Sequence, residues 1–427
     1  MSEPIFIARQ DTLEQEILPA HWLAQYKLFG EESYTFQNKE IWKKLCMSSA
    51  AANDRDMHAE ALEEMLTTFS AEHTGKWMLL VYGMDAAALE GLATMAAIAA
   101  NGTAMGAIVD NALLMHAIAN SETAMQRIAN SQTAMQRVAN NRGAMDAIGR
   151  SRIARDAVQA SPYYNSCIKE NDMAIAKLAV ALANLESAGY SGMAGVAADS
   201  TAMTAVAASA TAMTAVAASS VARNAISASP YYDEKIKEND MAIAKLVVGF
   251  ANLESAGYSG CAGMAADSTA MTAVAASSTA MTAVAASGVA LKAIAQAYKN
   301  TANMLQFLKA VNASDTLVKR IYSTLTGATG LFGATQLGSQ DGVESANSWA
   351  TTSAAPNAFL ACACGYYSSG GSSVNVTYNG TVIAQNKTGA KQPGSVASTN
   401  VNAITMAPST FTENGDGWLA VQKFTAK

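Results

Sequence analysis

The chain has few aromatic and few charged residues. Phe, Trp and Tyr make up 7% of its 427 residues and charged residues 15%, whereas hydrophobic residues, mostly alanine, make up 50%. So few bulky side chains favour thin helical layers over large cores. At this length we expect two or three domains.

Clusters of positive charge and paired cysteines are also missing. The net charge is -6, so the sequence offers no electrostatic footprint for nucleic acid or an anionic membrane. The five cysteines form no disulfide framework, and Cys261 stands in a methionine position of a repeat, which indicates a small buried side chain. The four histidines lack metal-ligand spacing, so we expect no metal and no cofactor.

Long uninterrupted apolar runs are absent as well. Glu90 interrupts the apolar stretch 86–99, and Lys177 interrupts 173–185. The first four residues are acidic and no signal-peptide core follows them. These features predict a soluble product made in the cytoplasm, without membrane insertion.

What the chain does contain is a ten-residue repeat, best preserved over Asp199 to Ser219. A methionine, or a residue in its place, recurs every ten positions and is followed three positions later by Val or Ile. We expect the following residues to form the core of the repeats: Met105, Met125, Met203, Val206, Met213, Val216, Met271, Val274, Met281 and Val284.

The period of ten favours one short helix per repeat over one long helix. Ten residues at roughly 100° each fall about 80° short of three turns, so the apolar stripe of a continuous helix would wind around it. Ser, Asn or Asp precedes each repeat as a helix N-cap. A helix of about seven residues is unstable alone, so stacking into an α-solenoid is predicted. A long trimeric coiled coil is the competing interpretation.

The ten-residue repeats, which we call decads, alternate with a different helix, and this larger arrangement occurs twice. The decad pattern is expected to break at Ser161-Pro162-Tyr163-Tyr164, and a longer helix with Asn171-Asp172 as its cap and Gly189 after its end should follow. The same order returns 68 residues later, which gives super-repeats 161–228 and 229–296. Arg155 and Arg223, which replace methionines, are expected to have a structural role, either snorkelling or bonding to carbonyls at a segment boundary.

The two ends of the chain lack the repeat. Residues 1–84 are predicted to form a small mixed attachment domain, with helices at 14–28, 39–46 and 54–70 and a β-prone run at 76–82. Residues 85–327 form the helical shaft. Residues 328–427, rich in Gly, Ser, Thr and Asn, are predicted to form a β-sandwich or jelly roll. It should include a hairpin at Asn379-Gly380, with Tyr378 opposite Thr381 and Val376 opposite Ile383.

Candidate chemistry is sparse. Tyr366, Tyr367 and Trp418 could form an aromatic platform for a host-surface receptor such as a sugar. Polysaccharide cleavage would need two carboxylates, and the pair Glu413 and Asp416 before the last strand is a weak candidate. We therefore expect no catalytic residues and no enzyme activity.

The repeats, such as Ser-Ala-Thr-Ala-Met-Thr-Ala-Val-Ala-Ala-Ser at 209–219, resemble the Ala/Met/Ser repeats of bacteriophage tail-fibre or neck-fibre proteins. The resemblance covers roughly residues 93–295. The family pattern of virion attachment region, repetitive shaft and β-rich tip would map onto 1–84, 85–327 and 328–427. Many fibre shafts are trimeric and β-structured, whereas this one is predicted to be helical.

The resemblance implies a structural protein of the virion that takes part in host attachment and forms a homo-oligomer. Its N-terminal part would bind tail, collar or baseplate proteins, and its C-terminal domain would bind a host-surface glycan, an outer-membrane protein or another virion protein. No nucleic-acid partner is implied. The alternative is a bacterial adhesin or an intracellular scaffold that uses the solenoid as a protein-binding surface.

Overall fold

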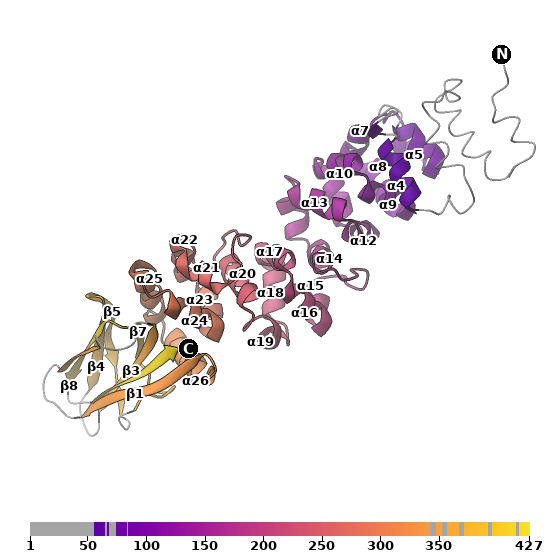
Figure 1. The fold of residues 1–427 in the computed structure, drawn as a ribbon. Helices are drawn as coiled ribbons and strands as arrows, with labels where there is room; N and C mark the ends of the chain where they lie inside the picture. The colour runs from indigo at the N-terminus through magenta and orange to yellow at the C-terminus, as the bar shows by residue number, and fades with distance from the viewer. Residues whose placement is uncertain are drawn as a thin grey trace, which may run out of the picture. The chain divides into compact units, whose positions relative to one another are not determined.

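The computed structural model describes residues 55–64, 66–67, 74–82, 84–341, 347–351, 357–366, 371–391, 395–415 and 418–427. It is mainly helical, with C-terminal antiparallel strands in two sheets (Figure 1). The chain divides into two compact units between Ala205 and Val206, and each is described by itself. The helices expected at 14–28 and 39–46 lie outside the described residues.

The described residues of the first unit form helices and the turns between them. Its elements are α4 (Arg55–Glu64), α5 (Thr74–Tyr82), α6 (Ala86–Leu89), α7 (Met95–Ala100), α8 (Gly102–Asp110), α9 (Ala112–Asn120), α10 (Glu122–Ala129), α11 (Gln132–Ala139), α12 (Arg142–Arg150), α13 (Arg152–Ala160), the π-helical turn η6 (Asn165–Lys169), α14 (Asp172–Leu182), α15 (Met193–Ala197) and α16 (Ser200–Ala208), which crosses into the second unit.

Each decad is one short helix, which confirms that prediction. In the best preserved repeats α16 ends at Ala208 and α17 (Ala210–Ala218) begins two residues later, so no uninterrupted helix runs through 199–219. The residue between consecutive helices is extended, for example Asn111 with φ -93° and ψ 100°, and it turns the axis of α9 by 102° from that of α8. A single extended residue per decad therefore redirects the chain.

Helices three places apart in the sequence pack on each other. In the first unit α8 contacts α11, α9 contacts α12, and α10 contacts α13. The methionine and the aliphatic residue of each decad lie in these contacts, and Met125 and Ile128 of α10 are both fully buried. Removing such side chains from water is the main source of stability for helices this short.

The apolar run at residues 76–82 is the helix α5, so the prediction of a β-prone segment there is wrong. Trp77 and Met78 are buried in the same apolar core as the first decads. A short apolar run fits a strand or a buried helix equally well by periodicity. Here the neighbouring helices α7 and α9, which contact α5, favour the helix. The predicted helix at 54–70 is confirmed over α4.

The longer helix α14 ends earlier than expected. Its cap Asn171 is confirmed, but the helix stops at Leu182 and Gly189 is not its C-cap. Asn184 adopts a left-handed conformation with φ 59°. The N–H of Leu185 then bonds the carbonyl of Val180 at 3.1 Å and the N–H of Asn184 bonds that of Ala181 at 3.0 Å. This is a Schellman motif, in which asparagine replaces the usual glycine.

The second unit begins with further helices. They are α17 (Ala210–Ala218), α18 (Ser220–Ser227), α19 (Tyr232–Lys235), α20 (Asp240–Phe250), α21 (Cys261–Ala266), α22 (Ser268–Ala276), α23 (Ser278–Ala286), α24 (Gly288–Gln296), α25 (Thr301–Asn312) and α26 (Asp315–Gly327). The contacts again join helices three places apart, from α17 with α20 to α23 with α26.

Among the described residues no single helix is long and apolar enough to cross a membrane. Three bent pairs of consecutive helices reach the required length and composition when each pair is taken together: α8 with α9, α16 with α17, and α22 with α23.

The strands follow the last helix. They are β1 (Phe332–Asp341), β2 (Asn347–Thr351), β3 (Ala358–Tyr366), β4 (Ser372–Tyr378), β5 (Thr381–Thr388), β6 (Ala390–Lys391), β7 (Ala403–Met406), β8 (Ser409–Gly415) and β9 (Trp418–Ala426). One sheet has the order β1-β9-β3-β6 with β7 also paired to β3, and the other has the order β2-β8-β4-β5. The neighbouring strands are antiparallel except for the short pair β3 and β6.

The hairpin predicted at Asn379-Gly380 is present between β4 and β5. Tyr378 lies opposite Thr381 as expected, and both turn residues have positive φ. Val376 pairs with Ala384, however, so the expected pairing with Ile383 is wrong. A β-bulge between Val376 and Thr377 shifts the register by one residue beyond the turn.

The last two helices are joined to the sheets by buried polar contacts. The amide of Asn312 on α25 donates to the carbonyl of Ile404 at 2.7 Å and accepts from its N–H at 3.0 Å, as a neighbouring strand would. The hydroxyl of Tyr322 on α26 donates to the carbonyl of Val396 at 2.9 Å. One apolar core continues from α20 to β9, across the boundary expected at 327/328.

A glycine allows a decad helix to pack closely on the long helix in both copies of this contact, but the glycine lies on the decad helix in one copy and on the long helix in the other. In the first, Gly149 of α12 faces Ala181 of α14; in the second, the equivalent residues are Ala217 of α17 and Gly249 of α20. A Cβ added at Gly249 would lie 2.3 Å from the carbonyl oxygen of Ala217. The glycine of this contact therefore lies on the decad helix α12 in the first copy and on the long helix α20 in the second.

We expect Gly249→Ala to destabilise the second unit by about 3 kcal/mol, because a backbone atom cannot give way as a flexible side chain can. Adding Ala217→Gly should recover part of this loss, since the pair then matches the arrangement of Gly149 and Ala181. Urea denaturation of the single and double variants checks this, and equal stability of Gly249→Ala and the unchanged chain would contradict it.

Candidate functional site

The N-cap side chains hold the short helices in two ways. The hydroxyl oxygen of Ser151 accepts a hydrogen bond from the N–H of Ala154 at 3.3 Å, which caps α13. The same hydroxyl donates to the carbonyl of Ala119, at the end of α9, at 2.6 Å. Because the carbonyls of a last helical turn have no partner within their helix, one serine satisfies both helix ends.

This double contact recurs at a regular distance along the chain. Ser131 donates to the carbonyl of Ala99 at 2.6 Å, and Ser161 donates to that of Ala129 at 2.5 Å. In each case the acceptor lies 32 residues earlier. We call these three contacts the cap clasps, and each joins the element that the serine caps to the helix four places before it.

The cap residues continue through a segment where the sequence was expected to lose the repeat. Caps stand every ten positions at Asn101, Asn111, Ser121, Ser131, Asn141, Ser151, Ser161 and Asn171. The turn Ser161–Tyr164 therefore interrupts the ten-residue spacing of the methionines but not that of the cap residues. The π-helical turn η6 takes the place of one decad helix. The spacing of Ser and Asn alone would have revealed this.

A carboxylate from the N-terminal part caps one of the first decads. Glu63 of α4 accepts from the hydroxyl of Ser121 at 2.5 Å, and from the N–H and hydroxyl of Thr123 at 3.1 and 2.6 Å. A negative charge is stabilising at a helix N-terminus. The helices α4 and α5 thus belong to the packing of the decads and share their core.

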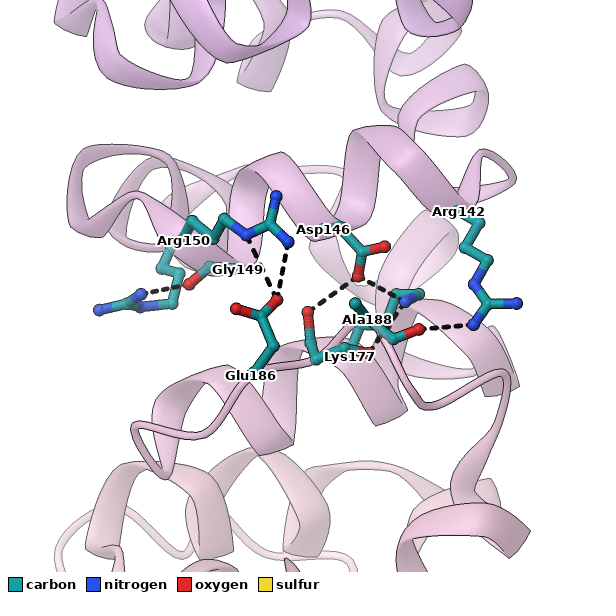
Figure 2. A network of polar contacts seen from close by, with 9 residues as sticks. Arg142, Asp146, Gly149, Arg150, Lys177, Glu186 and Ala188 are labelled. Carbon is teal, nitrogen blue, oxygen red and sulfur yellow. Dashed lines mark hydrogen bonds and ion pairs between the residues drawn. The ribbon is translucent and has the colours of Figure 1, made fainter. Parts of the chain in front are cut away.

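The most concentrated polar site surrounds Lys177 of α14 (Figure 2). The side chain of Lys177 is fully buried, and its Nζ lies 2.5 Å from Oδ1 of Asp146 on α12. It also donates to the carbonyl of Ser187 at 3.0 Å. A buried ammonium is tolerated only with such partners, so the ion pair fixes α14 against α12.

Two arginines of α12 bind the loop that follows α14. Arg150 forms an ion pair with Glu186 at 2.9 Å, and Arg142 donates to the carbonyl of Ala188 at 2.5 Å (Figure 2). Both pairs are exposed, so they contribute little stability individually. With Lys177 they attach the loop to α12 at several points.

The equivalent site in the second super-repeat keeps the lysine but not its carboxylate. Lys245 is buried and donates to the carbonyls of Ser255 and Ala256 at 2.9 and 3.3 Å. The position equivalent to Asp146 is Thr214. Burial lowers the pKa of the Lys245 amine, because the charged form is disfavoured away from water.

The arginines that replace methionine bond carbonyls, which is one of the two structural roles expected for them. Arg155 donates to the carbonyl of Gly149, and Arg223 donates to that of Ala217 at 2.6 Å. The guanidinium of Arg223 also lies 5.8 Å from the ring centre of Phe250.

All of the expected repeat-core residues are buried. This holds for Met105, Met125, Met203, Val206, Met213, Val216, Met271, Val274, Met281 and Val284.

The structure does not bring the three aromatic candidates together on a surface. Trp418 is fully buried in the apolar core and has no face available for stacking on a sugar. Tyr366 at the end of β3 is half-buried, and Tyr367 lies outside the described residues. Of the two candidate carboxylates, Glu413 is buried and Asp416 lies outside the described residues.

The cysteines have the environment of core residues. Cys261, Cys362 and Cys364 are buried, and burial raises the pKa of all three thiols, that of Cys364 to about 11. A raised pKa disfavours the reactive thiolate. In the part of the chain that the structure describes, no three His, Cys, Asp or Glu side chains gather where they could hold a metal ion.

No protein-family model matches the chain, and a search of curated proteins found no match. The interpretation of the site therefore depends on its own geometry.

We expect Ser151→Ala to lower the unfolding free energy of the first unit by about 2 kcal/mol, because a cap bond and a buried cap clasp are both lost. Ser287→Ala is the matched control. Ser287 is also fully buried and caps α24 at 3.1 Å, and among the described residues its hydroxyl has no clasp. Its loss should be about 1 kcal/mol. Equal losses in urea denaturation would contradict a role for the clasp.

We expect Lys177→Met to cost about 3 kcal/mol, because it leaves the Asp146 carboxylate without its buried partner. Lys245→Met should lower the unfolding free energy by about 1 kcal/mol or less, since it removes the donor of two carbonyls and leaves no carboxylate without its partner. Hydrogen exchange of the amides in α14 and α20 measures the two effects separately. A larger loss of protection in α20 than in α14 would contradict this account.

Proposed function

We propose that the chain is a non-enzymatic bacteriophage virion structural protein, a tail or neck fibre. Its short helices form an α-solenoid shaft, its N-terminal part attaches to the particle, and its C-terminal strands form a β-sandwich or jelly-roll tip that binds a partner. The observation that carries this proposal is the packing of each decad helix on the helix three places away.

That packing supports an extendable stem. Within each unit, decad helices contact their sequence neighbours and helices three places away, and the cap clasps of the first unit recur at a fixed separation of 32 residues. An array built from nearest-neighbour contacts can be lengthened by adding repeats without changing the existing ones. A structural fibre needs length with few residue types, which agrees with the Ala, Met, Ser and Thr composition.

The order of the parts along the chain supports attachment at the N-terminal end and recognition at the C-terminal end. The resemblance to fibre proteins assigns virion proteins of the tail, collar or baseplate to the N-terminal part. It assigns a host-surface glycan, an outer-membrane protein or another virion protein to the β domain. Because Trp418 is buried, we place recognition on the loops and strand ends around Tyr366.

Burial of the reactive groups supports recognition over catalysis. Cys362 and Cys364 of β3 and Glu413 of β8 are all buried. A glycosidase needs two carboxylates that reach the substrate. Glu413 has almost no exposed surface with which to do so.

Immunoelectron microscopy of purified phage particles tests the proposal. Antibody fragments against residues 328–427 should label the distal ends of fibres, and fragments against residues 1–54 should label their bases. Particles from a phage deleted for the gene are the control and should carry neither label. Labelling confined to the interior of cells, with none on particles, would contradict the proposal and favour an intracellular scaffold.

A glycan array with the full chain tests the nature of the receptor. If the tip binds sugar, Tyr366→Ala should weaken the signal while Val382→Ala, at an exposed position of β5, should leave it unchanged. Binding that neither variant alters would place recognition elsewhere on the chain.

A further inference from the structure

The first super-repeat shows what the buried lysine requires. Two donors meet at one atom, because Nζ of Lys177 lies 2.5 Å from Oδ1 of Asp146 and the hydroxyl of Ser187 donates to the same oxygen at 3.0 Å. A single negatively charged oxygen therefore satisfies a buried ammonium and a buried hydroxyl together.

The second super-repeat keeps both donors in the same sequence positions. Lys245 and Ser255 correspond to Lys177 and Ser187, and they are 2% and 3% exposed. The lysine also keeps its bond to the carbonyl of the serine, at 2.9 Å compared with 3.0 Å. The two donors are thus held in the same relation to each other in both copies.

The acceptor has been replaced. Thr214 stands where the first copy has Asp146, and its hydroxyl donates to the carbonyl of Ala210 in its own helix at 2.8 Å. Among the described residues, no carboxylate forms an ion pair with Lys245 and no atom forms a hydrogen bond with Oγ of Ser255.

Of the carboxylates near Lys245 and Ser255 in sequence, Glu254 is exposed and forms no ion pair with Lys245, and Glu238 accepts from the N–H groups of Gly288 and Val289 at 3.0 and 3.2 Å. Asp240 accepts from the N–H of Cys261 at 2.9 Å. Asp267 caps α22 and accepts from the hydroxyl of Tyr258 at 2.8 Å. The charge of Lys245 therefore lacks a counter-ion supplied by these residues.

We propose that Lys245 and Ser255 bind a small monovalent anion of the size of chloride, at the place that a carboxylate oxygen of Asp146 takes in the first copy. Two donors that converge on one atom suit a monatomic anion better than a larger oxyanion. Ala256, whose carbonyl also bonds Lys245, is exposed, so an ion can reach the site from the loop. The inference is independent of the proposed function.

The electrostatics of the site agree with this. Burial lowers the pKa of Lys245, and an anion beside Nζ would favour the charged amine again. Binding to the folded state alone reduces the unfolding constant by a factor that grows with anion concentration, about 100-fold at 100 times the Kd.

Chloride-35 NMR of the full chain tests the site directly. The unchanged protein should broaden the chloride line, and Lys245→Met should abolish the excess broadening. Thr214→Asp should abolish it too, because it supplies the carboxylate of the first copy. Ser255→Ala should weaken the affinity about 5- to 10-fold, as expected for one hydrogen bond of about 1 kcal/mol.

The first super-repeat provides the converse experiment. Asp146→Thr should create a second anion site at Lys177 and Ser187 and raise the bound chloride from one to two per chain. Circular dichroism identifies any variant that fails to fold, and Ser255→Ala, which removes a hydroxyl without a partner among the described residues, is then the decisive variant. No broadening by the unchanged protein, or broadening that persists in folded Lys245→Met or is unaltered in Ser255→Ala, would overturn the proposal.

Discussion

The structure depends on one constraint: each decad helix must end after about two turns, and an extended N-cap residue must begin the next helix. A side-chain oxygen at that residue accepts from the new helix, and its backbone N–H bonds the old one, as Ser151 does with Ala154 and Ile148. Helices this short have no stability alone. Their caps and their buried Met and Ile or Val side chains must therefore act together.

The cap clasp links local structure to packing. Serine is one of several good N-caps, but its hydroxyl can also donate, and at Ser131, Ser151 and Ser161 it donates to a carbonyl 32 residues earlier, in the helix four places before. Aspartate at the same position can only accept, as Asp267 does at the start of α22. The choice among cap residues thus decides whether a junction is only capped or is also tied to the neighbouring turn.

The two super-repeats show how one backbone plan accepts different side-chain chemistry. The contact between the decad helix and the long helix keeps one glycine in both copies, at Gly149 in one and Gly249 in the other. The buried lysine is kept as well, with Asp146 beside Lys177 and Thr214 in the equivalent position beside Lys245. The shared features are those that set the distance between backbones, whereas the charges that accompany them differ.

The sequence by itself determined the short helices, their buried methionines, the carbonyl contacts of Arg155 and Arg223 and the hairpin at Asn379-Gly380, because periodicity, caps and turn residues act over a few positions. It did not determine that residues 76–82 are helical or that Trp418 is buried, since both depend on which distant elements cover them. The bulge at Val376, the partners of Lys177 and the clasps across 32 residues were likewise decided by tertiary structure. Local patterns specify what a segment can form, but only packing between distant segments decides which polar atoms meet.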